Sequence, residues 1–354
     1  MLHGTKAECY FLDVGQGTSQ IITLGQGRAI VIDAGPADLS NTLLQTLENL
    51  QIHTLEAVVL SHNDDDHIGN ATNLLLQYPN SIGSLFFMRD RDIHNNVKYK
   101  NLVRCIGKML SEGNLDRRVI HDLVPSHNQR ETELFRERDA MGFEIILNLI
   151  YPTALWDSIQ AQMNGTPNDT CAVLMLSIGT SRIVFSGDAP FEAWIQMRND
   201  GQIFPLEVNA ATIPHHGGSL ACTGEEEKKF YSEMLCPKTG IISVGSRNLH
   251  NHPRPETIKN LVKSGIGILC TGMTQKCADI SKWKMNPLRF RPPEISRSYS
   301  TGLSCSGTVV VNIASQAIEI KHYDRYRRWI EKHPDRLCKP EICRIPKDSQ
   351  EFTE

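Results

Sequence analysis

The sequence predicts an α/β protein in which two β-sheets pack together and helices cover their outer faces. Three observations favour this class. Short β-branched runs alternate with segments of helical apolar spacing in both halves of the chain. Glycine turns separate neighbouring strands, as at 15–17 and 25–27. The 354 residues are 40% hydrophobic, which is enough apolar material for a sizeable core.

In the first half, apolar and β-branched runs identify the strands, and apolar residues three and four apart identify the helices. The runs 20–24 and 29–33 flank Gly25-Gln26-Gly27 and are expected to form a hairpin. The expected strands are 9–14, 20–24, 29–33, 57–60 and 143–150, and the expected helices are 41–50, a helix from about 68, and 98–110.

The second half repeats this alternation, and the run 307–313 is expected to close the sheet. The other expected strands are 172–178, 182–185, 208–213, 240–244 and 265–270, and the expected helices are 190–197, 225–235, 255–263 and a charged helix from 321.

We interpret residues 1–320 as one domain, followed by a C-terminal helix and tail at 321–354. The segments 89–142 and 278–304 are interpreted as insertions, because they offer little apolar pattern for a second core.

Charge and cysteine content restrict the compartment and the partners. The formal net charge is −3, so attraction to nucleic acid or anionic lipid would have to come from local patches. The chain has no run of about 18 apolar residues, which argues against a membrane span. Residues 1–8 lack the form of a signal peptide, and ten cysteines without a leader favour a reducing compartment. The expected location is the cytoplasm.

The cysteines near the 278–304 segment allow two interpretations. Cys277 and Cys305 could hold that segment together through a structural zinc ion, with Cys270 close by in sequence. The chain has no compact Cys-x-x-Cys pair, so buried free thiols are the preferred interpretation.

Four potential metal ligands lie within six residues of the sequence. His62, Asp64, Asp66 and His67 directly follow the apolar run 57–60. A strand-to-helix turn can aim such closely spaced side chains at one point, and imidazoles mixed with carboxylates suit Zn²⁺ or Mn²⁺. The alternative is an acidic surface turn, but histidines that bracket alternating aspartates are much rarer than such turns.

This cluster and the motifs around it resemble the metallo-β-lactamase superfamily, whose metal motif is H-x-H-x-D-H. The form H-x-D-x-D-H is most similar to the branch represented by the hydrolase domain of the ComEC competence protein. The supporting stretches are Leu12-Asp13-Val14-Gly15-Gln16-Gly17, Val31-Ile32-Asp33-Ala34-Gly35, Ser186-Gly187-Asp188, Pro214-His215-His216-Gly217-Gly218, Ile242-Ser243-Val244-Gly245 and His252-Pro253.

The resemblance covers residues 8–313 and implies a four-layer αββα metallo-β-lactamase sandwich with two divalent ions, Zn or Mn. It implies that His62 and Asp64 help bind the first ion, while Asp66 and His67 bind the second. Asp188 matches the acid that bridges both ions.

The last histidine ligand is left open among three positions. His252 is preferred as the distal metal ligand, with His215 as a further metal-site candidate. His216 would line the same pocket and protonate a leaving alkoxide. Asp33 matches an acid that orients the metal ligands, and Asp13 is expected beside the pocket.

Two positions depart from the superfamily pattern. Where many members have a histidine before the Ser-Gly-Asp stretch, this chain has Asn168-Asp169-Thr170-Cys171. Asn168 and Asp169 are therefore kept as pocket candidates. Thr18 stands where the ComEC branch usually has an aspartate after the Gly-Gln-Gly turn.

A two-metal centre activates water, so hydrolysis is the expected reaction. The preferred hypothesis is a phosphodiesterase or nuclease acting on DNA or RNA, in which Asp66 also orients the water. Basic and aromatic residues at 282–284, 289–291 and 325–329 would contact phosphates and bases, unless they are only a solvated loop and helix. The alternatives are hydrolysis of a small ester, thioester or lactam, and a non-catalytic metal-binding regulatory subunit. A separately encoded protein partner is also expected.

Overall fold

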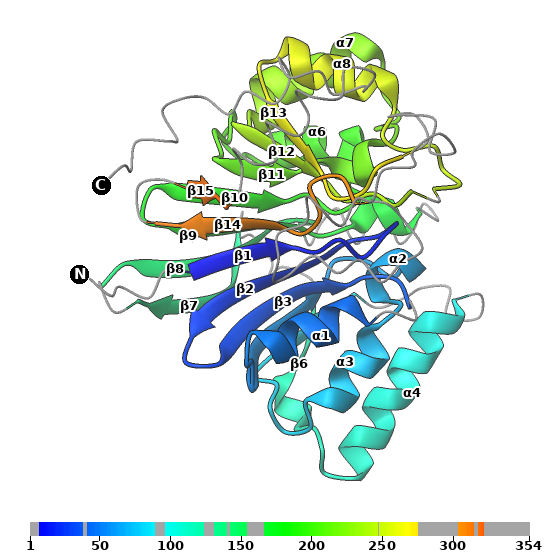
Figure 1. Cartoon of the computed structure of the whole chain (residues 1–354), viewed down its shortest axis with the longest axis vertical. Helices are drawn as coiled ribbons and strands as arrows, with labels where there is room; N and C mark the ends of the chain where they lie inside the picture. The colour runs from blue at the N-terminus through cyan, green and yellow to red at the C-terminus, as the bar shows by residue number, and fades with distance from the viewer. Residues whose placement is uncertain are drawn as a thin grey trace.

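Two β-sheets form the centre of the computed structural model, and helices lie on their outer sides (Figure 1). The structure describes residues 7–37, 41–88, 96–123, 131–139, 142–153, 166–246, 248–274, 304–314 and 318–321.

Sheet A has the strand order β15-β14-β1-β2-β3-β4-β5-β6. The neighbours from β14 to β3 are antiparallel, whereas β3 to β6 run parallel to one another. Its strands are β1 (Ala7–Phe11), β2 (Ser19–Gly25), β3 (Arg28–Ala34), β4 (Thr54–Leu60), β5 (Leu85–Phe87), β6 (Ile120–Asp122), β14 (Val309–Ile313) and β15 (Ile318–Ile320).

Sheet B has the strand order β13-β12-β11-β10-β9-β8-β7. The four strands from β10 to β13 are parallel, and β9, β8 and β7 extend the sheet in antiparallel fashion. Its strands are β7 (Thr132–Arg138), β8 (Glu144–Tyr151), β9 (Val173–Ile178), β10 (Ser181–Phe185), β11 (Ala210–Thr212), β12 (Thr239–Ile242) and β13 (Gly267–Cys270).

The helices divide between the two outer faces. Helices α1 (Thr42–Asn49), α3 (Ala71–Gln77) and α4 (Val97–Ser111) lie beside sheet A, and the one-turn α2 (Asp65–Ile68) follows β4. Helices α6 (Phe191–Asn199), α7 (Gly224–Lys229) and α8 (Pro255–Lys263) lie beside sheet B. No helix among these residues is long and apolar enough to cross a membrane.

Alternation along the strands explains the layers, because successive side chains of a strand point to opposite faces. Ile30 and Ile32 of β3 point into the core between the sheets. Val31, between them, belongs instead to the core under α1 and α3. Such strands are buried on both sides, which is why their sequences are continuous apolar runs.

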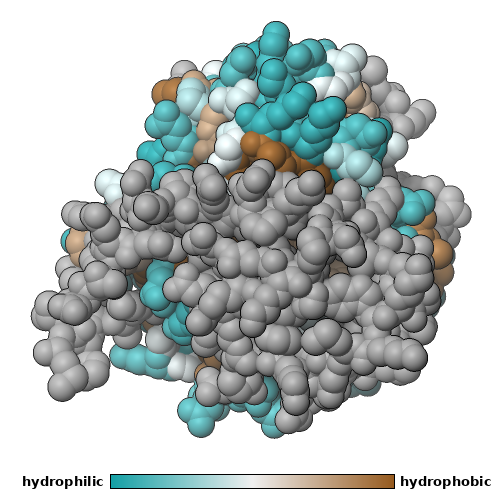
Figure 2. Space-filling model, turned by 45° about the horizontal axis from the view of Figure 1, so that its top comes forward, coloured by the Kyte–Doolittle hydropathy of each residue, from teal (hydrophilic) through white to brown (hydrophobic). Residues whose placement is uncertain are grey.

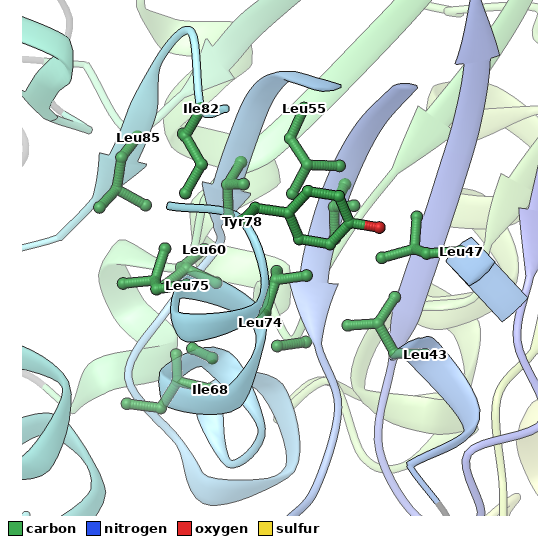
Figure 3. Packing of buried hydrophobic residues seen from close by; sticks show 14 of the residues in the cluster. Leu43, Leu47, Leu55, Leu60, Ile68, Leu74, Leu75, Tyr78, Ile82 and Leu85 are labelled. Carbon is green, nitrogen blue, oxygen red and sulfur yellow. The ribbon is translucent and has the colours of Figure 1, made fainter. Parts of the chain in front are cut away.

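The core on the outer side of sheet A is built largely of leucines (Figure 3). Leu43 and Leu47 of α1 lie four residues apart and so share one face of the helix. They belong to the same cluster as Leu74 of α3 and Leu60 of β4. Burying one such side chain contributes about 1.5–3 kcal/mol, so this packing holds β4 firmly against the helices.

The outer helices of sheet B are amphipathic in the same way. Figure 2 shows a mostly hydrophilic surface where α7 and α8 lie, above a small hydrophobic strip. Ile258 and Leu261 of α8 point inward and belong to the core of that side, together with Trp194 of α6.

The arrangement of helix, sheet, sheet and helix confirms the predicted four-layer αββα sandwich. The expected hairpin at Gly25-Gln26-Gly27 is present as β2 and β3. The strands β6 and β7 were not predicted. Both come from the 89–142 segment and lie at sheet edges, where polar residues replace the apolar pattern. The division into domain and tail stays a prediction, because most of 278–304 and 321–354 lies outside the described residues.

Candidate metal centre

The candidate residues lie at the carboxyl ends of parallel strands from both sheets. In sheet A, Asp33 is the penultimate residue of β3 and the metal loop 61–67 follows β4, its parallel neighbour. In sheet B, Asp188 follows β10 and His216 follows β11, which is also parallel to it. Carboxyl ends of parallel strands share one edge of a sheet, so the strand directions alone gather these side chains.

The metal loop turns sharply against a neighbouring glycine loop. Gly17, with φ of 136°, lies so close that a Cβ there would stand 2.4 Å from the carbonyl oxygen of Asp66. The next residue, Thr18, donates its N–H to that same carbonyl at 3.1 Å. The loop 15–17 therefore needs glycine at this point and fixes the backbone of Asp66.

Two groups of side chains come within metal-binding reach of one another. The first is His62, His67 and Asp188, all buried, and the second is Asp66, His67 and His216. In the first, Asp188 Oδ1 lies 3.4 Å from His67 Nε2. In the second, His216 Nε2 lies 3.2 Å from Asp66 Oδ2, and it also lies 3.5 Å from Asp188 Oδ1. His67 thus belongs to both groups, and Asp188 lies close to a member of each.

Each histidine of these groups is oriented through its Nδ1 atom. His67 Nδ1 contacts Asp33 Oδ2 at 2.7 Å, and His216 Nδ1 contacts the Ser243 carbonyl oxygen at 2.8 Å. His62 Nδ1 lies 3.2 Å from the Ser61 hydroxyl. The Nε2 atoms of all three rings are buried without a hydrogen-bond partner among the described residues. Buried polar atoms are nearly always paired, so these three unpaired nitrogens are candidate ligands for a cation.

Asp33 is the central anchor of this arrangement. It is 1% exposed and has φ of 54°. Its Oδ1 accepts the Ser61 N–H at 2.7 Å, and its Oδ2 accepts the Ser61 hydroxyl at 2.8 Å in addition to its contact with His67. A carboxylate in this position fixes the ring tautomer so that Nε2 of His67 faces the site.

The electrostatics of the site favour positive charge. Burial opposes charge on the His67 ring, but Asp33 and Asp188 raise its pKa well above the ordinary value. Burial also opposes charge on Asp188, but His216 and His67 hold its pKa well below the ordinary value. For Asp66, His216 and His67 lower the pKa in the same way against the effect of burial. The low pKa values favour the ionised form of both Asp66 and Asp188.

Cys171 lies directly behind the first group. Its Sγ lies 3.4 Å from His62 Nδ1 and accepts the backbone N–H of Asp188 at 3.1 Å. A Cβ at Gly187 would stand 2.4 Å from this sulfur, so only glycine lets the two segments approach so closely. The thiol thus connects two candidate ligands that come from opposite sheets. Our sequence reasoning named the stretch 168–171 but not Cys171 as a site residue.

Of the three late histidines, the structure brings only His216 into a metal-binding group. His215 Nε2 stays 4.0 Å from Asp188 Oδ2, and His215 Nδ1 contacts the Ser219 carbonyl oxygen. His252 stacks on His216 with ring centroids 6.5 Å apart, and burial with its positive neighbours lowers its pKa to about 4. His215 and His252 therefore lie beside the candidate ligands Asp188 and His216.

Ser243 anchors His216, a role that the sequence did not predict. It contributes a backbone carbonyl rather than a side chain, so its type gives no signal.

The other predicted residues have structural partners. Asp13 accepts a hydrogen bond from Ser304 at 2.5 Å. Asp169 Oδ2 accepts the N–H and hydroxyl of Thr166 and caps a short helix, while Asn168 lies in that helix and accepts the Cys171 N–H at its carbonyl oxygen. Asp64 is part of neither group as well, but its Oδ2 lies 3.5 Å from His62 Nε2.

Comparison with known proteins agrees with this geometry. Residues 12–84 match the metallo-beta-lactamase superfamily. The chain is 25% identical over 289 residues to ComE operon protein 3 of Bacillus subtilis, a match that covers 75% of this chain and 32% of that protein. It is 40% identical over 73 residues to Recombination protein 2 of Haemophilus influenzae, covering 20% of this chain and 9% of that protein. The chain thus spans a third or less of the length of these relatives.

Among solved structures, human tRNase Z, short form, is similar with a TM-score of 0.41 and 11% identity, over 67% of this chain and 92% of that one. The segment that matches the superfamily, 12–84, contains Asp33, which anchors His67, and the metal loop itself. The chain is therefore similar to the metallo-β-lactamase superfamily over residues 12–84 and to ComE operon protein 3 over 289 residues.

Proposed function

We propose that this chain is a metal-dependent phosphodiesterase that cleaves nucleic acid at the site described above. The observation that carries the proposal is the convergence of three buried Nε2 atoms, from His62, His67 and His216, on carboxylates from both sheets. These residues fit divalent ions, since their Nδ1 atoms are already engaged and their Nε2 atoms have no other partner.

The residues divide naturally between two ions. His62, Asp64 and Asp188 would hold the first, and Asp66, His67 and His216 would hold the second, with Asp188 shared between them. Two divalent ions at these positions would polarise a phosphate and make water a better nucleophile at neutral pH. With three carboxylates among six side chains, the site is rich in oxygen and suits Mn²⁺ as well as Zn²⁺.

The remaining residues of the pocket orient these groups and contact substrate. Asp33 keeps the proton of His67 at Nδ1, and the Ser243 carbonyl does the same for His216. The sequence suggests that His216 protonates a leaving group. In the structure, its Nδ1 contacts the Ser243 carbonyl oxygen and its Nε2 faces Asp66 and Asp188. His215 is more open, with 32% of its side chain exposed, and would be available to contact substrate.

Relatives favour a nucleic-acid substrate over a small ester. Recombination protein 2 bears a name that refers to a process on DNA, and it is the relative with 40% identity over 73 residues. The nucleic acid is the part of the proposal that needs the most direct test.

The experiment compares substrate classes on metal-loaded protein. Purified chain with Mn²⁺ or Zn²⁺ is incubated with bis(p-nitrophenyl) phosphate, labelled DNA, labelled RNA, and a panel of chromogenic esters, thioesters and lactams. We expect hydrolysis of the phosphodiesters, abolished in Asp188→Asn and His67→Ala. Hydrolysis of an acyl substrate alone would assign the site to small-molecule chemistry. Metal binding without any hydrolysis would favour a regulatory subunit.

A further inference from the structure

Helix α4 has a charge pattern unlike that of the other long helices in the described chain. Its 15 residues include Lys98, Lys100, Arg104 and Lys108 but no aspartate or glutamate. The other described helices of eight or more residues, α1, α6 and α8, each contain a glutamate. In a chain with net charge −3, this is a concentrated positive segment.

Three of these cations form one stripe along the helix. Lys100, Arg104 and Lys108 follow one another at intervals of four residues, which places them on the same face about 6 Å apart along the axis. Arg104 and Lys108 are exposed, whereas the apolar face with Leu102 and Met109 is buried. Arg104 has no carboxylate partner in the described part of the chain, and Lys108 reaches Glu112 at 3.7 Å only at the helix end.

Helix stability does not account for this face. Lys98 and Lys100 lie in the first turns, where the helix dipole disfavours positive charge. Gly107 lies on the exposed face between Arg104 and Lys108, and a Cβ there would meet nothing within 4 Å. A glycine in an exposed helix interior destabilises the helix by about 1 kcal/mol relative to alanine. The positive charge at the helix start and the small Gly107 would instead let an anionic chain approach the helix closely.

The start of α4 is joined to the metal loop. The Asn96 side chain accepts the Tyr99 N–H at 2.9 Å, and so caps the helix. The same side chain donates through Nδ2 to the Asn63 carbonyl oxygen at 2.7 Å. The helix therefore begins at the loop that carries His62 and Asp66 and runs away from it along one side of the molecule (Figure 1).

We infer that the cationic face of α4, with half-buried Lys100 and exposed Arg104 and Lys108, binds the sugar-phosphate backbone of a nucleic-acid strand whose scissile phosphate lies in the metal centre. The regular cationic spacing fits a polyanion, and the hydrogen bond from Asn96 to the Asn63 carbonyl oxygen places the start of the helix against the metal loop. The inference rests on the proposed function for the identity of the strand as substrate. It names a substrate contact that lies outside the metal centre.

A matched pair of variants tests the inference on the full chain. Arg104→Gln/Lys108→Gln removes two cations of the stripe, and Lys259→Gln/Lys263→Gln removes an exposed pair with the same spacing from α8. Fluorescence anisotropy measures the Kd of labelled single-stranded DNA and RNA over a range of NaCl concentrations, with EDTA present to prevent cleavage. Thermal melting by circular dichroism checks that both variants fold.

The α4 variant is expected to bind about tenfold or more weakly at low salt, and its slope of log K against log[NaCl] should flatten by roughly 1.4 for two lost phosphate contacts on a single strand. The α8 variant should match the wild type. Equal affinities and slopes for the two variants, or no nucleic-acid binding by the wild type, would overturn the inference. The inference would also be overturned if the α4 variant lost binding to anionic phosphatidylserine vesicles while its binding of nucleic acid was unchanged.

Hydrolysis of bis(p-nitrophenyl) phosphate separates this inference from the proposed function. This small substrate does not extend to α4, so the α4 variant with Mn²⁺ should cleave it at the wild-type rate. If the wild type fails to cleave it, the proposed activity is wrong, while the anisotropy result still decides whether α4 binds nucleic acid.

Discussion

Replacing Asp33 by asparagine tests whether the metal centre is built through the anchors of its histidines. Asp33 does not belong to either metal-binding group, but it holds His67 Nδ1 at 2.7 Å and the Ser61 hydroxyl at 2.8 Å. An asparagine can keep one acceptor oxygen, but its amide group would present a donor to the N–H of His67. The ring would then rotate or change tautomer, and Nε2 would no longer face the site.

The size of the effect follows from comparable anchors in other metal sites, where loss of the partner lowers metal affinity by about 10-fold to 100-fold. This corresponds to about 1.4–2.7 kcal/mol of binding free energy. The assay is competition for Zn²⁺ against a chromophoric chelator of known affinity. A metal-free melting curve measures the stability of each variant separately.

Asp13→Asn provides the matched control. Asp13 is also a buried aspartate, 2% exposed, and it accepts a hydroxyl hydrogen bond from Ser304 at 2.5 Å. It lies outside both metal-binding groups, so its replacement should affect stability but leave Zn²⁺ affinity unchanged. If the two asparagine variants bind Zn²⁺ equally well, Asp33 does not orient a ligand and the reasoning is refuted.

Three further predictions use the same metal and stability assays. Cys171→Ala should lower Zn²⁺ affinity by up to about tenfold, Cys171→Ser should restore most of it, and Cys9→Ala, a buried thiol elsewhere, should not change it. His216→Ala should reduce the number of bound ions measured by mass spectrometry, whereas His252→Ala should leave it unchanged; the reverse result would make His252 the ligand. Glu227→Ala should lower the free energy of unfolding in urea by about 1–3 kcal/mol, because two buried partners in α8 lose their acceptor, and unchanged stability would contradict this.

The local features of the site could be predicted because they depend on neighbours in sequence. An apolar strand followed by His62, Asp64, Asp66 and His67 fixes both the position and the donor types of the loop. The same holds for Asp188, which directly follows a buried strand. In each case, the strand supplies the rigidity and its end supplies the ligand.

The choice between His216 and His252 could not be predicted, because it depends on contacts far apart in the chain. Both histidines lie in polar loops after buried strands, and their chemistry is identical. In the structure, His216 belongs to a group of possible ligands and its Nδ1 lies 2.8 Å from the Ser243 carbonyl oxygen, whereas His252 belongs to neither group. A Cβ at Gly218 would stand 2.5 Å from His252 Cε1 and 2.9 Å from His252 Nε2, so only glycine lets this ring pack so closely. Neither a backbone carbonyl nor such a contact is visible in residue types.

The charge balance of the pocket connects the fold to the proposed chemistry. Asp33, Asp66 and Asp188 gather at the ends of strands from both sheets, where desolvation disfavours negative charge. The pKa of Asp188 is nevertheless low, because the rings of His216 and His67 supply positive charge, and the pKa values of those rings are raised in return. Protons on these imidazoles thus balance the negative charge of the carboxylates. Divalent cations would balance the same charge by binding to the same Nε2 atoms. Under the proposed function, divalent ions would replace these protons at the same nitrogen atoms.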